Sequence, residues 1–335
     1  MSMIIVTGAA GFIGANLVAA LVARGEKDLV VADAFRSSGA GPDAPPTQTR
    51  YLDAWPLRKR VDKEKLRAWL GRYGKTTRAV FHLGACSDTT VTDVEWVLRN
   101  NLEYSRVLWQ WCTRARVPFI YASSAATYGD GARGFDDEAD PSHLKPLNLY
   151  GKSKHLFDLW ALEQADAPPR WVGLKYFNVY GPREEHKGRM ASVAFHSYRQ
   201  IRERGEVRLF ESHRPEIPHG GQRRDFAFVE DAVAATLHFL DAPASDQTPN
   251  GLYNVGTGTA RTFEDLAKAV FAALGLTAKI AYIPMPEDLR ERYQYFTQAT
   301  TAKLRRAGFG QPFHSLEDGV RKYVRYLETG GSAPR

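Results

Sequence analysis

The sequence predicts an α/β fold, with a doubly wound parallel sheet followed by a smaller C-terminal region. Three observations support this fold class. Short, β-branched apolar runs alternate with segments of helical periodicity, which is typical of parallel strands joined by crossover helices. The apolar runs are nearly continuous, so helices are expected to cover both faces of the sheet. A glycine-rich turn directly follows the first run and opens the first helix.

The expected elements follow one another along the chain. The strands are Met3–Thr7, Leu29–Ala32, Ala79–His82, Phe119–Ala122, Trp171–Tyr176 and Leu252–Val255. The helices are Phe12–Arg24, Asp93–Arg114, Tyr150–Gln164, Val229–Leu240 and Phe263–Leu274. The last helix is preceded by the N-cap pattern Thr262-x-x-Asp265. Residues 36–50 are rich in Gly, Pro, Ser and Thr, and are expected to form a flexible loop.

The alternation of strands and helices loosens after about residue 177, where loops rich in charged and aromatic residues begin. We therefore expect residues 1–176 to form a dinucleotide-binding domain. Residues 177–335 are expected to form a smaller substrate-binding region. That region is interleaved with the last elements of the sheet, at about residues 225–257.

Composition and charge restrict the class of protein. A hydrophobic content of 44% with 25% charged residues is ordinary for a soluble globular chain. The N-terminus lacks a signal-peptide pattern and no apolar run approaches the roughly 18 residues of a membrane helix, so we expect a cytoplasmic protein without a membrane partner. Cys86 and Cys112 lack the spacing of a metal site or disulfide framework. The net charge of +7 suits an anionic small molecule as well as nucleic acid, although no nucleic-acid motif is present.

The glycine motif Gly8-x-x-Gly11-x-x-Gly14 predicts a Rossmann-type dinucleotide site. Glycines in these places permit a tight turn, close approach of backbone N–H groups to a pyrophosphate, and close helix-on-strand packing. Asp33 follows about 20 residues later, where a carboxylate accepts hydrogen bonds from the adenosine ribose. A turn or cap role is the alternative for Asp33. Nearby Arg36, Arg50 and Lys63 could hold a 2′-phosphate, which would favour NADP, but spacing does not decide between NADP and NAD.

A second group of residues carries acid–base chemistry. Tyr150 and Lys154 are four residues apart at the start of a helical pattern, hence on one face. Bringing a phenol of pKa about 10 near neutrality requires about 4 kcal/mol of preferential stabilisation of the phenolate. Lys154 and a positive nicotinamide could supply it together. Ser124 leaves a strand at its carboxyl end, where its hydroxyl could donate to a carbonyl or alkoxide oxygen.

These motifs together resemble those of the extended short-chain dehydrogenase/reductases that modify nucleotide sugars. More narrowly, residues 3–328 are similar to the ADP-L-glycero-D-manno-heptose 6-epimerase family. The resemblance rests on FHLGACSDTT, YASSAATYG, PLNLYGKSK, YFNVYGPREEHKGRMASVAFH, RRDFAFVED, YNVGTG and RYQYFTQA. The stretch HKG-x-MASVAFH is the part least shared with other sugar epimerases. The resemblance implies an ADP-heptose substrate, NADP as cofactor with NAD as the alternative, and a homo-oligomer, by resemblance a pentamer.

The resemblance also implies a mechanism. In the family, a hydride leaves C6 of the heptose, the resulting ketone turns, and the hydride returns to the opposite face. The oxygen then need not lie where the hydroxyl began, so a second proton donor is required on the other side of the sugar. The resemblance gives this role to Lys187, opposite Tyr150, while Lys154 orients the ribose and tunes Tyr150.

Lys187 would have to exchange protons near neutrality, although a free lysine has a pKa of about 10.4. We expect burial, or neighbouring cations such as Arg183, to lower its pKa. Glu184 and Glu185 would oppose this unless they point away.

Further binding residues carry over from the resemblance. The cofactor set is Gly8, Gly11, Phe12, Ile13, Gly14, Asp33, Ala34, Lys63, Leu83, Gly84, Ala85, Cys86, Ser87, Asn100, Lys154, Val179 and Lys187. The substrate set is Asn178, Arg189, His196, Phe210, Glu211, Ser212, Arg224 and Tyr293, in which Arg224 can pair bidentately with a diphosphate.

The sequence departs from the family pattern at several positions. Arg189 stands where a serine is usual and either adds a phosphate contact or points to water. His213 replaces a glycine, Leu83 replaces an acidic residue, and loops 36–50 and 213–222 are longer. These departures bear on which sugar the protein accepts as its substrate.

Three alternatives share parts of this pattern. A UDP-hexose 4-epimerase shares Ser124, Tyr150 and Lys154 but does not account for HKGRMAS. A nucleotide-sugar 4,6-dehydratase has Thr-Asp-Glu after the serine strand, where this chain has Ala125-Ala126-Thr127. A non-catalytic NADP-binding sensor would keep the fold without needing the acid–base residues.

Overall fold

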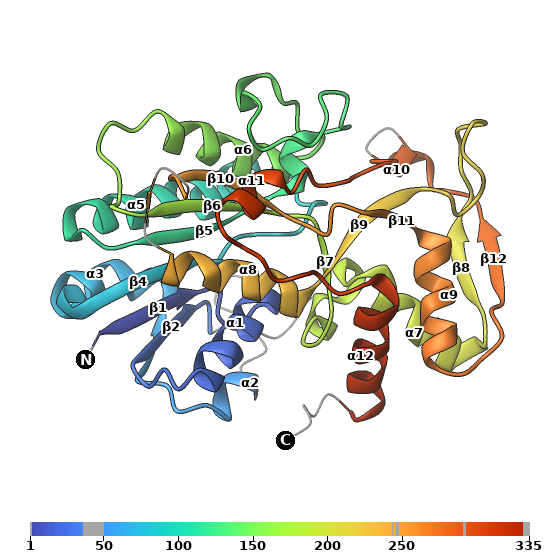
Figure 1. The fold of residues 1–335 in the computed structure, drawn as a ribbon, viewed down its shortest axis with the longest axis horizontal. Coiled ribbons are helices and arrows are strands. Elements are labelled where there is room, and N and C mark those ends of the chain that lie inside the picture. Colours follow the sequence, from blue (N-terminus) through green and yellow to red (C-terminus); the bar gives the residue numbers. More distant parts are fainter. Residues whose placement is uncertain (1, 36–49, 243, 246–247, 291–292, 331–335) are drawn as a thin grey trace.

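The computed structural model describes residues 2–35, 50–242, 244–245, 248–290 and 293–330. Its largest feature is a seven-stranded sheet in the order β10-β6-β5-β4-β1-β2-β3, with every pair parallel (Figure 1). The strands are β1 (Met3–Thr7), β2 (Leu29–Asp33), β3 (Lys59–Asp62), β4 (Thr77–His82), β5 (Phe119–Ser124), β6 (Trp171–Tyr176) and β10 (Gly251–Val255). The predicted doubly wound α/β fold is confirmed.

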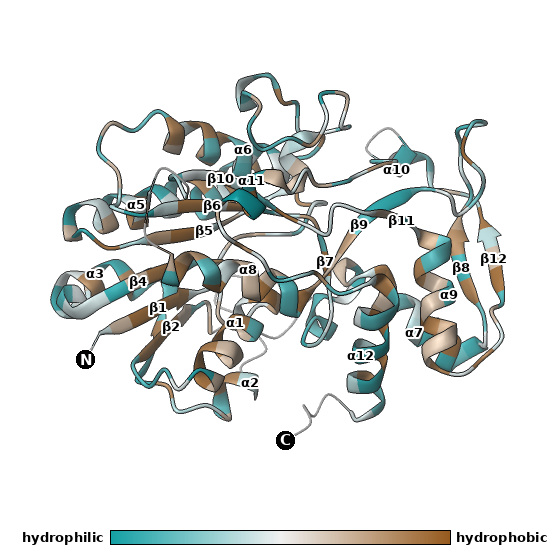
Figure 2. Ribbon diagram, in the orientation of Figure 1, coloured by the Kyte–Doolittle hydropathy of each residue, from teal (hydrophilic) through white to brown (hydrophobic). Residues whose placement is uncertain are grey.

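Helices cover both faces of this sheet. They are α1 (Phe12–Ala23), α2 (Arg50–Asp53), α3 (Lys63–Tyr73), α4 (Val94–Leu98), α5 (Tyr104–Ala115), α6 (Leu149–Leu162) and α8 (Val229–Asp241). Alternation along β1 sends Ile4 and Val6 into one core with α1 and α8, and Met3 and Ile5 into another with α3, α5 and α6. Each such buried side chain contributes roughly 1.5–3 kcal/mol. Figure 2 shows the matching hydrophobic colouring along the strands.

The predicted helix Asp93–Arg114 is divided in the structure. A π-helical segment, Arg99–Glu103, separates α4 from α5. The widened turn carries Asn100 and Asn101 beside the loop that follows β4. Such π segments often occur at functional sites, and this one holds the loop that follows β4 through Asn101.

Strand β3 and helix α3 were not predicted, because their polar sequences hide the apolar pattern. In β3 only Val61 is buried, while Lys59 and Arg60 are exposed at the edge of the sheet. The predicted loop 36–50 lies outside the described residues except at its end, where Arg50 begins α2. That last residue of the loop prediction was wrong.

The later elements form two smaller sheets beside the large one. A three-stranded sheet has the order β11-β9-β7, and β8 pairs in parallel with β12. Their bounds are β7 (Asn178–Tyr180), β8 (Val207–Phe210), β9 (Arg223–Phe228), β11 (Ala260–Thr262) and β12 (Ile280–Ile283). The helices here are α7 (Val193–Arg204), α9 (Phe263–Ala273), α10 (Glu287–Arg290), α11 (Ala302–Arg306) and α12 (Leu316–Glu328).

The smaller sheets and α7, α9 and α12 share a third apolar core. Figure 1 shows β8, β12, α7 and α9 grouped at one end of the molecule, whereas α8 and β10 lie with the large sheet. The predicted capping box of α9 is present, with Thr262 and Asp265 each accepting the other's backbone N–H. The domain limits given above stay a prediction.

Candidate active site

A cavity of about 960 Å³ lies between the carboxyl ends of the large-sheet strands and the elements β8, β9, α7 and α9. Most of the predicted site residues line it together. They are Gly8, Gly11, Phe12, Ile13, Gly14, Asp33, Leu83, Gly84, Ala85, Ser87, Ser124, Tyr150, Lys154, Asn178, Val179, Lys187, Arg189, His196, Phe210, Arg224 and Tyr293. Residues separated by up to 285 positions therefore meet in one space.

The glycine turn between β1 and α1 has no room for side chains. Gly8 has φ +68°, and a Cβ there would lie 2.5 Å from the Gly84 backbone nitrogen. A Cβ on Gly14 would lie 2.0 Å from the Gly8 carbonyl oxygen. Gly11 is the N-cap of α1 and provides no side-chain cap, and the first turn has no acidic residue, so the N-terminal N–H groups of α1 are available to an anion. The turn fits a dinucleotide pyrophosphate.

Replacing Gly14 with alanine is expected to weaken nicotinamide dinucleotide binding at least tenfold, because the new methyl group would push α1 away from the Gly8 turn. Isothermal titration with the cofactor measures this. Gly71→Ala is the matched control, since a Cβ on Gly71 meets nothing within 4 Å. Unchanged affinity in a folded Gly14→Ala protein would show that the turn is not the pyrophosphate site.

Asp33 ends β2 beside the glycine turn. Its carboxylate accepts the backbone N–H of Ala10 and of Ala34, both at 2.8 Å. Burial raises the pKa of Asp33, while these two bonds and the charge of Lys63 oppose the rise. Asp33 therefore stabilises its own turn and also lines the cavity. The predicted ribose-binding role and the alternative turn role are thus compatible.

Lys63 and Asn100 form a bridge at the same end of the cavity. Lys63 Nζ donates to Asn100 Oδ1 at 2.5 Å, and its charge acts on Asp33. The two side chains do not themselves line the cavity. Arg36 lies outside the described residues.

The loop after β4 is held by a residue that the sequence did not single out. Buried Asn101 accepts the backbone N–H of Cys86 at 2.8 Å and donates to the Cys86 carbonyl and to Ser153 Oγ, both at 2.9 Å. It therefore ties the loop after β4 to α6. The neighbouring Asn100 was predicted on resemblance, and the π segment brings Asn101 to this position.

Ser124, Tyr150 and Lys154 meet where β5 ends and α6 begins. Asn148 caps α6 by accepting the N–H of Gly151 at 2.8 Å, which fixes the turn that carries Tyr150. Lys154 is 4% exposed and donates from Nζ to the Ala122 carbonyl at 2.8 Å. Burial lowers the pKa of Lys154 to about 8, against the raising charges of Asp158 and Cys86.

The expectation that Lys154 draws down the pKa of Tyr150 is not met in the chain alone. Burial raises the pKa of the Tyr150 phenol, and only a hydrogen bond with the Ser124 side chain lowers it. Lys154 instead directs its Nζ at a backbone carbonyl of β5. A phenolate at Tyr150 therefore needs positive charge from a bound molecule.

Lys187 enters the same cavity from a different segment, the 3-10 stretch Glu185–Met190. Its Nζ lies 5.3 Å from the centroid of the Phe12 ring. Burial lowers the pKa of Lys187, and the charge of Glu184 opposes the change. The predicted effect of burial is present. A contribution from Arg183 is not, because Arg183 donates to Asn16 at 2.7 Å and stacks on Tyr51 and Trp55.

Glu184 fixes the segment that carries Lys187. This fully buried carboxylate accepts the N–H of Gly181 at 3.1 Å, and the N–H and hydroxyl of Ser192, each at 2.6 Å. It joins the two ends of the Lys187 loop. Glu185, in contrast, accepts from Tyr51 at 3.0 Å.

Arg224 is a buried cation that lines the cavity from β9. It is 6% exposed and stacks on Phe263 and Tyr293, 5.5 and 5.4 Å from the ring centroids. Burial lowers the pKa of Arg224 to about 10. Within the described parts of the chain no carboxylate forms an ion pair with Arg224, so its charge is available to an anionic ligand.

Other predicted contacts differ in the structure. Arg189 is exposed and lines the cavity, and its guanidinium donates to Thr90 Oγ1 at 2.6 Å, so its phosphate contact stays a prediction. Thr90 in turn is bound to Asp88. The predicted residues that do not line the cavity are Ala34, Lys63, Cys86, Asn100, Glu211 and Ser212.

Several lining residues were missed by the sequence analysis. They include Thr89, Gln200, Arg208, Gln222, Phe263 and Gln294. Arg208 alternates with buried residues in β8, a signal that would have been readable had that strand been recognised. His213, which replaces a glycine, bonds to the Tyr295 hydroxyl at 2.8 Å, outside the cavity lining.

Two classes of feature are missing from the described ranges. No helix within them is long and apolar enough to cross a membrane. No group of three or more His, Cys, Asp or Glu side chains there could hold a metal ion.

Residues 4–256 match the model of the NAD dependent epimerase/dehydratase family. The chain belongs to this family. A Fusobacterium nucleatum relative named ADP-L-glycero-D-manno-heptose-6-epimerase is 44% identical, covering 96% of this chain and 97% of its own length. The epimerase/dehydratase fold is also seen in the Helicobacter pylori enzyme of that name, with a TM-score of 0.80, 29% identity, and coverage of 98% of this chain and 96% of that one.

A third relative bears on the cofactor of the epimerase/dehydratase family. MoeE5, solved in complex with UDP-glucuronic acid and NAD, has a TM-score of 0.75 at 26% identity, covering 98% of this chain and all of that one. The family and this relative indicate a nicotinamide cofactor and a nucleotide-sugar substrate.

Proposed function

We propose that this chain converts ADP-D-glycero-D-manno-heptose to ADP-L-glycero-D-manno-heptose by inverting C6, as a step in making the heptose precursor of the lipopolysaccharide core. The observation that carries this is the placement of Lys187 in the same cavity as Ser124, Tyr150 and Lys154. A proton donor from a second segment is what an inversion through a ketone requires. Full-length similarity to relatives of that name supports the same substrate.

The residues divide the chemistry between them. A bound nicotinamide would supply an acceptor and donor of the C6 hydride, and its oxidised form would supply the positive charge that favours a Tyr150 phenolate. Tyr150 and Lys187 act in turn as the base that removes the hydroxyl proton and the acid that restores it. Ser124 donates a hydrogen bond to the reacting oxygen, and Lys154 orients the ribose.

The substrate must be held while the ketone turns. We assign the diphosphate to Arg224, whose buried guanidinium has aromatic faces on two sides and no carboxylate partner within the described residues. Asn178, His196, Phe210 and Tyr293 complete the sugar side in this proposal. Anchoring at the diphosphate leaves the heptose side chain free to rotate.

Proton NMR of the reaction with ADP-D-glycero-D-manno-heptose tests the function. Inversion at C6 is the expected result. A deoxy-keto product would identify a dehydratase, and tight cofactor binding without turnover would identify a sensor. Inversion at C4 of a UDP-hexose, with ADP-heptose unchanged, would identify a 4-epimerase.

We propose NADP rather than NAD as the cofactor, because Lys63 lies close enough to Asp33 for its charge to act there, at the ribose end of the cavity. Lys63→Met is expected to weaken NADP binding about tenfold while leaving NAD binding nearly unchanged, as the loss of one phosphate contact implies. Isothermal titration with both cofactors measures this. Lys65→Met, which alters an exposed lysine of the same helix, is the control. Equal loss of affinity for NAD and NADP would contradict a 2′-phosphate contact.

We also propose an oligomeric state and a cellular location. By resemblance we expect a homo-oligomer, with the pentamer as the specific expectation, in the cytoplasm. Neither nucleic acid nor membrane is expected as a partner. Light scattering of the purified chain measures the oligomeric state.

A further inference from the structure

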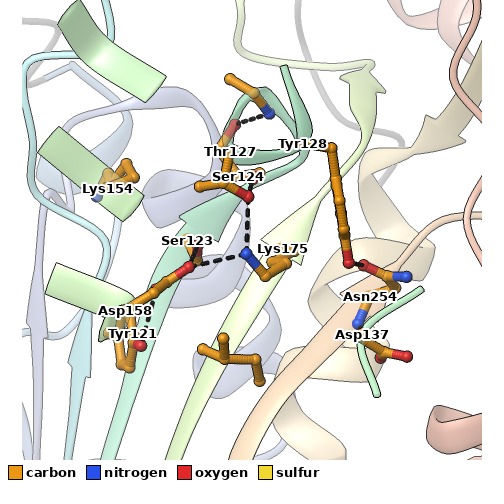
Figure 3. A network of polar contacts seen from close by, with 12 residues as sticks. Tyr121, Ser123, Ser124, Thr127, Tyr128, Asp137, Lys154, Asp158, Lys175 and Asn254 are labelled. Carbon is orange, nitrogen blue, oxygen red and sulfur yellow. Dashed lines mark hydrogen bonds and ion pairs between the residues drawn. The ribbon is translucent and has the colours of Figure 1, made fainter. Parts of the chain in front are cut away.

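A buried ion pair lies directly behind the catalytic end of the cavity. Lys175 of β6 and Asp158 of α6 meet with Nζ and Oδ2 2.9 Å apart, and their side chains are 2% and 0% exposed. Asp158 also accepts from the Tyr121 hydroxyl at 2.9 Å and from Ser123 Oγ at 2.6 Å. Figure 3 shows Lys175 between Asp158 and the Ser124–Tyr128 turn.

Lys175 is connected to Ser124 through Thr127. Lys175 Nζ donates to Thr127 Oγ1 at 2.7 Å, and the Thr127 hydroxyl donates to the Ser124 carbonyl at 2.8 Å (Figure 3). The β5–β6 register places Lys175 opposite Ser123. Its Nζ also lies 5.0 Å from the Tyr128 ring centroid. The Lys175 ammonium group therefore supports, through Thr127, the backbone that carries Ser124.

Asp158, the acidic member of the pair, lies one turn after Lys154 on α6. Its negative charge raises the pKa of Lys154, in opposition to burial. Other titratable groups facing this region are Cys86 in the loop after β4, His82 at the end of β4, and His155 on α6. From outside the cavity, the pair therefore reaches the Ser124 backbone through Thr127 and acts on Lys154 through the charge of Asp158.

Stability alone does not account for such a pair. Removing two charges from water costs several kcal/mol per ion, and apolar replacements of similar volume are often neutral or stabilising. Lys175 is not free to serve the substrate, because Asp158 and Thr127 already engage its Nζ. The position of Lys175 therefore indicates that it fixes the geometry of the Ser124–Tyr128 turn.

We propose that Asp158 and Lys175 are positioning residues for the reaction. They hold the Ser124 turn, at the end of β5, and Lys154 of α6 in a fixed position relative to each other. This inference rests on the proposed epimerase function. The pair contacts neither substrate nor cofactor and acts through Thr127, Ser123 and the α6 backbone.

Thr127→Val tests the link to Ser124 with little change of shape. It removes the hydroxyl between Lys175 and the Ser124 carbonyl, and kcat is expected to fall about tenfold while KM for the nucleotide sugar changes less than about twofold. The double variant Asp158→Asn/Lys175→Met leaves no buried charge unpaired and is expected to fold, with kcat about 10–100-fold lower. Asp231→Asn, which alters a buried aspartate bonded to His314, is the control and is expected to keep wild-type kcat.

The pH profile separates positioning from mere support of the fold. The carboxylate of Asp158 raises the pKa of Tyr150 as well as that of Lys154. Asp158→Asn removes this effect, and the unpaired Lys175 cation acts in the same direction. The acid limb of kcat/KM, which reports formation of the base, is therefore expected to move to lower pH. The double variant is expected to move it in the same direction by less.

The results of these measurements distinguish failure of the positioning role from failure of the proposed function. Wild-type kcat together with an unmoved acid limb in folded Thr127→Val and double variants would overturn the inference while leaving the proposed function intact. A wild-type chain that leaves C6 of ADP-heptose unchanged would overturn the function and the inference together. Equal losses in Asp231→Asn would show that any buried aspartate has the same effect, which also overturns the inference.

Discussion

Lys187→Met is expected to lower the epimerase turnover by about 10²–10⁴-fold, the usual range for loss of a general acid or base. Methionine keeps the length of the side chain and its contact with Phe12 but cannot carry a proton. The protein should fold at least as well, because a half-buried cation, whose pKa burial lowers, is replaced by an apolar group. Cofactor-loaded turnover by proton NMR, together with the thermal midpoint, measures both effects.

Glu185→Gln is the matched control for Lys187→Met. Glu185 belongs to the same 3-10 stretch, but its carboxylate accepts from Tyr51. Near-wild-type turnover is expected from this variant. Full turnover by a folded Lys187→Met protein would remove Lys187 from the mechanism.

Tyr150→Phe is expected to lower the turnover by a similar factor of about 10²–10⁴, because the variant loses the phenolic proton and its exchange with the C6 hydroxyl. Loss of one hydrogen bond with Ser124 should cost only about 1 kcal/mol of folding free energy. Cofactor affinity should stay within a few-fold, since Lys154 keeps its bond to the Ala122 carbonyl. Steady-state kinetics, chemical unfolding and cofactor titration separate these effects.

Tyr180→Phe is the control for Tyr150→Phe. Tyr180 is buried and bonds to the Leu316 carbonyl at 3.4 Å, but it does not line the cavity. A comparable loss of turnover in both variants would indicate that fold stability, and not proton exchange, limits the rate.

The sequence was most informative where one short segment determines the local structure. The glycine turn, the strand before it and the helix after it are a single unit, and the lack of room at Gly8 and Gly14 agrees with the motif. Tyr150 and Lys154 share one helix, so their spacing alone places them together. The strands of the large sheet were recognised wherever both of their faces are buried, and β3 was missed because it is a polar edge strand.

Contacts between distant segments could not be predicted in this way. Arg189 donates to Thr90, 99 positions away, and Arg183 donates to Asn16, 167 positions away, and neither contact could be read from the local sequence. The pKa of Tyr150 also depends on burial by the whole fold, which outweighs the nearby Ser124. Nothing in the local sequence distinguishes Glu184 from Glu185, yet Glu184 is fully buried and holds the Lys187 loop.

In the proposed mechanism, Tyr150 and Lys187 serve the two C6 epimers from opposite sides of the sugar. The most direct test follows the absorbance of reduced nicotinamide in a single turnover, with each ADP-heptose epimer given to Lys187→Met and to Tyr150→Phe. We expect crossed behaviour: the epimer that one variant still oxidises is the epimer that the other does not. Equal impairment of both epimers in both variants, or oxidation of the same epimer by both, would contradict it.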